Sequence, residues 1–125
     1  MYKITVTRNR RFAASLMPYW IIIGIPKAEF YARFGLNGDS CEMSPAGFPV
    51  ARLDASTLDR IGGIRIKNGQ TLELNVVDCN VPLFVSTSDG YLSNEIILSD
   101  YLSCHDRVFI NTHGGFSKLP HPMIE

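Results

Sequence analysis

Residues 64–77 have the sequence IRIKNGQTLELNVV, in which apolar and polar side chains alternate on either side of an Asn-Gly pair. Alternation with a period of two is typical of a strand that buries one of its faces. Asn68 and Gly69 both tolerate positive φ, which a two-residue hairpin turn requires. The stretch therefore predicts a β-hairpin whose strands cover residues 64–66 and 70–77.

Similar strand patterns occur along most of the chain. We predict further strands over 2–7, 19–25, 81–86, 95–98 and 107–112. The run over 19–25, YWIIIGI, is continuously apolar, which indicates a strand buried on both faces. About seven short strands without a long amphipathic helix predict an all-β fold. We expect a single antiparallel β-sandwich of immunoglobulin-like or transthyretin-like type.

The segment 26–63 interrupts this pattern. Residues 26–34 fit either a short helix or a strand, and we favour the strand because its Phe and Tyr residues favour strands. Residues 35–49 are rich in Gly, Asn, Asp, Ser and Pro, which predicts a loop. Residues 53–61 predict one or two helical turns, for which Ser56 is the candidate cap.

Length and charge limit the organisation and the partners. The chain has 125 residues, which corresponds to one domain that needs neither metal nor disulfide to fold. We expect a β-sandwich domain over residues 1–116, with the insertion 26–63, and a flexible tail over 117–125. Lys plus Arg and Asp plus Glu both number 12, so the formal net charge is zero. Zero net charge disfavours nucleic acid as a partner and mildly favours self-association.

The cysteines and the N-terminal segment bear on the cellular compartment of the protein. Cys41, Cys79 and Cys104 are odd in number and contain no C-x-x-C spacing, which argues against a disulfide scaffold. Reduced thiols are typical of cytoplasmic proteins. The apolar stretch 12–25 is interrupted by Pro18 and lacks an A-x-A cleavage site. We therefore expect a cytoplasmic protein without a membrane partner.

Four stretches carry a resemblance to a known family: ITVTR at 4–8, PYWIII at 18–23, IKNGQTLEL at 66–74 and SNEIIL at 93–98. The pattern resembles small immunoglobulin-like β-sandwich domains of bacterial proteins, loosely related to PEGA and carboxypeptidase regulatory-like modules. Such domains often have a Pro-Gly-x-His turn where this chain has DCNVP, residues 78–82. The resemblance covers about half of the chain and implies a non-catalytic role by analogy.

The strongest candidates for chemistry are Cys104, His105 and Asp106, together with His113. A thiolate beside an imidazole is a nucleophile pattern, in which a carboxylate orients the ring. His105, Asp106 and His113, with His121 as a further ligand, also suit a transition metal. However, neighbours on one strand point to opposite faces, and paired close metal ligands are missing. We therefore expect no catalytic residue, no metal and no cofactor.

Binding candidates lie in the N-terminal third of the chain. If the first strand continues, Arg8 and Arg10 project from one face, as a phosphate-binding pair would. Trp20 and Tyr31 belong to an aromatic group that could bind a sugar or a peptide, although core packing is the alternative for Trp20.

The sequence therefore predicts a non-enzymatic binding or interaction module. A long irregular insertion or an exposed sheet edge would contact a protein partner, and sheet extension would give a homodimer. The alternative is a small metalloprotein or hydrolase-like enzyme centred on Cys104, His105, Asp106 and His113.

Overall fold

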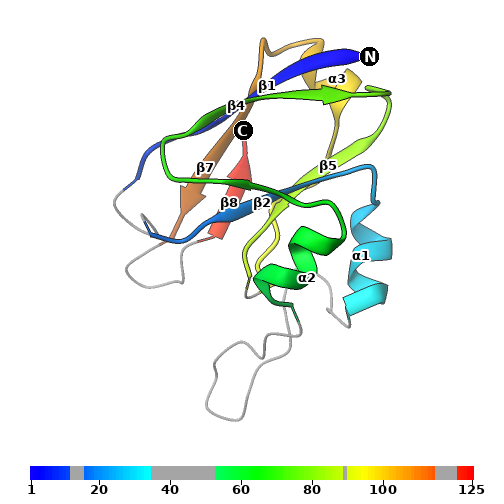
Figure 1. Cartoon of the computed structure of the whole chain (residues 1–125). Coiled ribbons are helices and arrows are strands. Elements are labelled where there is room, and N and C mark those ends of the chain that lie inside the picture. The colour runs from blue at the N-terminus through cyan, green and yellow to red at the C-terminus, as the bar shows by residue number, and fades with distance from the viewer. Residues whose placement is uncertain (12–15, 35–52, 89, 115–120) are drawn as a thin grey trace.

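The computed structural model describes residues 1–11, 16–34, 53–88, 90–114 and 121–125, and it is mainly β (Figure 1). Sheet A contains, in spatial order, β4 (Thr71–Val76), β1 (Tyr2–Arg8), β7 (Val108–His113) and β8 (His121–Ile124). Sheet B contains, in spatial order, β3 (Ile64–Ile66), β2 (Tyr19–Ile23), β5 (Pro82–Ser86) and β6 (Ile96–Ile97). The helices are α1 (Lys27–Phe34), α2 (Ala55–Arg60) and α3 (Leu98–Leu102). In these ranges no helix is both long enough and apolar enough to cross a bilayer.

The two sheets share one hydrophobic core. Alternation along β1 turns Ile4 and Val6 to the same face, and both are buried. Sheet A contributes Ile4, Val6, Val76, Val108, Ile110 and Ile124 to this core, and sheet B contributes Tyr19, Ile21, Ile66, Leu83 and Val85. The predicted all-β class is confirmed in its coarser form: the described fold is mainly β, with three short helices in addition.

The second core lies on the opposite face of sheet B. Trp20 and Ile22 of β2 point to this face, where they pack with Phe30 of α1 and Leu58 of α2. The rings of Phe30 and Phe84 meet edge to face, with their centroids 5.1 Å apart. Figure 1 shows α1 and α2 on the same side of β2. The prediction that β2 is buried on both faces is confirmed.

The Asn68-Gly69 turn forms, but the predicted hairpin does not. Gln70 N donates to Lys67 O at 3.0 Å, and Gly69 has a φ of +77°. However, β3 pairs with β2 in sheet B, whereas β4 pairs with β1 in sheet A over six residue pairs. A turn fixes only the local reversal of the chain. The longer pairing with β1 then determines the partner of β4, and the turn connects the two sheets.

Residues 27–34 form a helix, so the preference for a strand was wrong. Helical spacing brings Phe30 beside Phe34, with ring centroids 4.8 Å apart, and Glu29 to Arg33 at 2.8 Å. These i,i+4 contacts, and the complete burial of Phe30 against sheet B, outweigh the strand propensity of the aromatic residues. The predicted loop 35–49 lies outside the described residues.

Helix α2 confirms the prediction of one or two helical turns, with a different cap. Asp54 Oδ1 accepts hydrogen bonds from Thr57 N at 2.7 Å and from Ser56 Oγ at 2.9 Å. Asp54 is therefore the N-cap, and Ser56 lies inside the first turn. These hydrogen bonds also lower the pKa of Asp54 below its ordinary value. Gly62 follows the helix with a φ of +92°, a left-handed conformation that glycine commonly adopts just after a helix end.

The C-terminal region differs from prediction in two respects. Residues 121–124 form β8, which pairs antiparallel with β7, and Ile124 is buried. The flexible tail predicted over 117–125 is therefore wrong for residues 121–125, because Ile124 completes the core between the sheets. Moreover, β1 and β7 pair in parallel, so the expectation of a wholly antiparallel arrangement was wrong.

Candidate functional site

Arg8 lies inside the protein rather than on its surface. The alternation that buries Ile4 and Val6 also turns Arg8 inward, and its side chain is completely buried. Its Nη1 atom donates to Met17 O at 2.6 Å and to Ile66 O at 3.0 Å, while its guanidinium carbon lies 3.6 Å from the centre of the Tyr19 ring. Burial lowers the pKa of Arg8, which Tyr19 partly offsets. Arg8 therefore holds neighbouring segments together and is not a surface contact.

Of the two predicted aromatic binding residues, Trp20 is also internal. Trp20 is 1% exposed, and its Nε1 atom donates to Asp59 Oδ1 at 2.9 Å. Arg65 also binds Asp59, with Nε to Oδ1 at 3.1 Å and Nη2 to Oδ2 at 2.6 Å. The hydrogen bonds from Arg65, and then the one from Trp20, lower the pKa of Asp59 to about 2. Tyr31 of α1 is half-buried and packs against the second core, which contains Trp20.

Among the predicted binding residues, Arg10 lines a surface cavity. It lines a cavity of about 500 Å³ together with Arg65 and Lys67. Leu16, Met17, Pro18 and Asn68 complete the described lining. We call this cavity the Arg10 cleft.

The candidates for catalysis or metal binding are brought together only in part: the rings of His113 and His121, on the paired strands β7 and β8, lie with their centroids 6.0 Å apart. The ring of His105 stacks on Tyr101 with centroids 3.9 Å apart, and Cys104 Sγ lies 3.6 Å from Ser103 Oγ. Asp106 faces Arg107 at 3.6 Å, whereas His113 lies on β7 and binds Glu125.

These contacts do not join the candidates into one site. Cys104, His105, Asp106 and His113 do not share a set of contacts, and the described ranges contain no group of three or more ligands suited to a metal.

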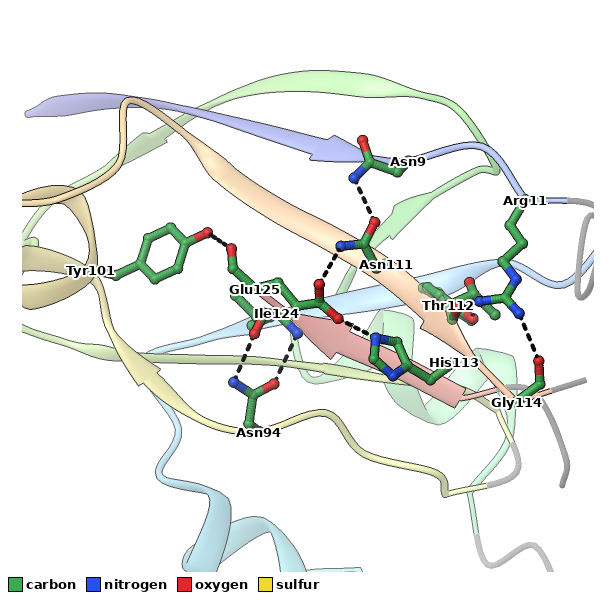
Figure 2. Close-up of polar contacts among 11 residues, drawn as sticks. Asn9, Arg11, Asn94, Tyr101, Asn111, Thr112, His113, Gly114, Ile124 and Glu125 are labelled. Carbon is green, nitrogen blue, oxygen red and sulfur yellow. Dashed lines mark hydrogen bonds and ion pairs between the residues drawn. The ribbon is translucent and has the colours of Figure 1, made fainter.

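A polar network missed by the sequence analysis covers the outer face of sheet A (Figure 2). Asn9 Nδ2 donates to Asn111 Oδ1 at 2.5 Å, and Asn111 Nδ2 donates to Glu125 Oε2 at 3.1 Å. The other carboxylate oxygen of Glu125 binds His113 Nε2. Its sequence signal is the placement of Asn111 and His113 at alternate positions of β7, on the face opposite Ile110. The network joins β1, β7 and the end of β8.

The β8 edge of sheet A is closed to a further strand. The side-chain amide of Asn94 donates to Ile124 O and accepts from Ile124 N, both at 2.9 Å (Figure 2). Asn94 therefore occupies the main-chain groups that a neighbouring strand would use. Two residues earlier, Pro122 has no N–H to offer at the same edge. The edge strands of sheet B, β3 and β6, have three and two residues, and such short strands are poor templates for pairing.

Among the described residues, no strand pairs with the β4 edge of sheet A. Arg8 N donates to Gln70 O at 2.9 Å, which fixes the pattern of the β1–β4 ladder. By alternation, Thr71, Glu73 and Asn75 direct their main-chain groups away from β1. Within the described part of the chain, the main-chain groups of these three residues have no hydrogen-bond partner. Six residues of β4 therefore present an extended template.

Exposed apolar side chains gather at one end of this edge. Val77 is 82% exposed, Tyr2 is 56% exposed and Met1 is 88% exposed. Because Tyr2 pairs with Val76, the three side chains lie at the same end of the β1–β4 ladder. The described ranges contain one further large apolar residue this exposed, Leu16.

No protein-family model, curated protein or solved structure matches the chain. The likeness to PEGA and carboxypeptidase regulatory-like modules therefore stays a prediction.

Proposed function

We propose that the chain is a non-enzymatic interaction module, an immunoglobulin-like β-sandwich that self-associates through its β4 edge. In the homodimer, β4 of a second copy lies antiparallel to β4 and extends sheet A. The observation that carries this proposal is the difference between the two edges of sheet A. Asn94 and Pro122 close the β8 edge, whereas three residues of β4 offer their main-chain groups.

The sequence of β4 favours one register. Two-fold pairing centred on Leu74 places Glu73 opposite the second copy's Asn75, and Thr71 opposite its Val77. This register covers exposed Val77 and sets Leu72 opposite Val76 on the buried face. A register centred on Glu73 would instead place two carboxylates directly opposite each other, which is destabilising.

Charge changes at Asn75 test the proposal and its register. Asn75→Glu places two pairs of carboxylates opposite each other, and Asn75→Lys places two pairs of opposite charges there. At up to about 1 kcal/mol for each of the two cross-strand pairs, the two substitutions shift the dimer dissociation constant by up to about thirtyfold, in opposite directions. Sedimentation equilibrium over a range of protein concentrations measures this constant.

Asn80→Glu is the matched control, because Asn80 is exposed and lies outside β4. A strictly monomeric protein at the highest soluble concentration would refute self-association. An equal effect of Asn75→Glu and Asn80→Glu would refute the register. If the monomer instead bound an extended peptide along β4, the edge would serve a different partner and the homodimer would be wrong.

Cytoplasmic location forms part of the proposal. Cys79 and Cys104 are free thiols in the described ranges, which supports a reducing compartment. Cys41 lies outside the described residues.

A further inference from the structure

The Arg10 cleft lies where three segments meet. Arg10 follows β1, Leu16, Met17 and Pro18 precede β2, and Arg65 with Lys67 come from β3 and the residue after it. One part of the lining is therefore cationic and another is apolar. The described lining contains no carboxylate.

Hydrogen bonds from buried Arg8 connect the two walls of the cleft. Buried Arg8 donates a hydrogen bond to the main-chain oxygen of Met17, which belongs to the apolar wall. It donates a second hydrogen bond to the main-chain oxygen of Ile66, which lies between the cationic residues Arg65 and Lys67. These two hydrogen bonds fix the apolar wall relative to the cationic wall. Asp59 accepts two hydrogen bonds from Arg65 and thereby fixes the orientation of its guanidinium group. The same carboxylate also accepts a hydrogen bond from Trp20. The positions of the walls are thus set without a ligand, which lowers the cost of binding one.

Gly69 lets Arg10 lie close to the turn after β3. A Cβ atom at position 69 would lie 3.0 Å from Arg10 Nε and 3.4 Å from its Nη2. Such an approach is closer than an ordinary van der Waals contact, so the absence of a side chain at Gly69 leaves room for the Arg10 guanidinium.

The charges in the cleft are unbalanced. Among the described residues, neither Arg10 nor Lys67 forms an ion pair, whereas Arg65 binds Asp59. Three cations and one carboxylate leave a local charge of plus two. A phosphomonoester carries about −1.5 to −2 at neutral pH and therefore matches this charge. Guanidinium groups also donate two parallel hydrogen bonds to a phosphate.

We propose that the Arg10 cleft binds a small phosphomonoester. Its phosphate lies among Arg10, Arg65 and Lys67, and its organic group lies against Leu16, Met17 and Pro18. The cavity of about 500 Å³ falls in the size range of small-molecule sites. A nucleic acid would instead require an extended row of cations on a basic protein, and this chain has zero net charge.

Phenyl phosphate is the test ligand, because it joins a phosphate dianion to an apolar ring. We expect saturable changes in the ¹H–¹⁵N NMR spectrum, confined to the residues that line the cleft. Arg10→Gln and Lys67→Gln each remove a charge-assisted contact and should weaken binding by about tenfold or more. Both side chains are exposed, so the variants should keep the thermal midpoint of the wild type.

Lys3→Gln is the control, because Lys3 is an exposed cation that pairs with Glu73 elsewhere on sheet A. It should leave the affinity unchanged. Equal weakening by Lys3→Gln and Lys67→Gln, or shifts spread over all exposed cations, would overturn the proposal. Inorganic phosphate should bind more weakly than phenyl phosphate, and equal affinities would refute the role assigned to the apolar wall. These outcomes do not depend on the oligomeric state and therefore leave the β4 proposal untouched.

Discussion

Asn94 provides a sharp test of how the β8 edge is maintained. Its side-chain amide makes two hydrogen bonds to the main chain of Ile124, both 2.9 Å long and partly buried. A typical hydrogen bond in a protein contributes about 1 kcal/mol to stability, so Asn94→Ala should lower the free energy of unfolding by about 2 kcal/mol. For a domain of this size, that loss corresponds to a fall in the thermal midpoint of about 8 °C.

The measurement is urea denaturation followed by tryptophan fluorescence. Trp20 is the single tryptophan of the chain and is 1% exposed, so its emission reports the loss of the core. Asn80→Ala makes the same chemical change at an exposed position and should alter stability by less than about 0.5 kcal/mol.

Asn94→Ala also frees the main-chain N–H and C=O of Ile124. Sedimentation should therefore show additional self-association in this variant, because β8 becomes a second edge available for pairing. If Asn94→Ala and Asn80→Ala had equal stability and equal mass distributions, Asn94 would not protect the edge.

Two further predictions concern the surroundings of the Arg10 cleft. The pKa of Asp59 is lowered from 3.8 to about 2, so its carboxylate stabilises the fold fully above about pH 4 and loses this effect as the pH falls towards 2. The thermal midpoints of wild type and Asp59→Asn should therefore converge over that acidic interval, and a constant difference would contradict the assignment. Gly69→Ala should cost about 1 kcal/mol because φ is +77°, and it should also weaken phenyl phosphate binding because the new Cβ displaces Arg10. Gly62→Ala has similar backbone strain at a φ of +92° with nothing within 4 Å, so it should lower stability and leave binding intact.

The strands were predictable because period-two alternation records burial directly. The pattern at Ile4 and Val6, and the unbroken apolar run of β2, correspond to one-sided and two-sided burial in the structure. Asn68-Gly69 predicted the turn for the same local reason. The pairing partner of β4 was not predictable, because it depends on which distant strand offers the longest ladder.

The site residues were harder to predict, because orientation depends on tertiary context. Arg8 and Arg10 are two residues apart, so a continued strand would direct both side chains to the same face. Arg8 lies within β1 and points inward, whereas Arg10 lies beyond the end of the strand and is exposed. Asn94 carries no local signal, since its role depends on Ile124, 30 residues later in the chain. Likewise, the contribution of residues 121–124 depends on β7 being in place.

The parallel pairing of β1 with β7 has a consequence for biosynthesis. Asn9 and Asn111, which bond across this pair, are 102 residues apart in the chain. At about 5–20 residues per second, a ribosome needs about 5 to 20 seconds to make the intervening segment. During that delay β1 lacks its neighbour β7, and sheet A stays incomplete. We therefore expect slow refolding in vitro, as is usual for folds dominated by distant contacts, and a nascent chain that depends on chaperones until its last strands emerge.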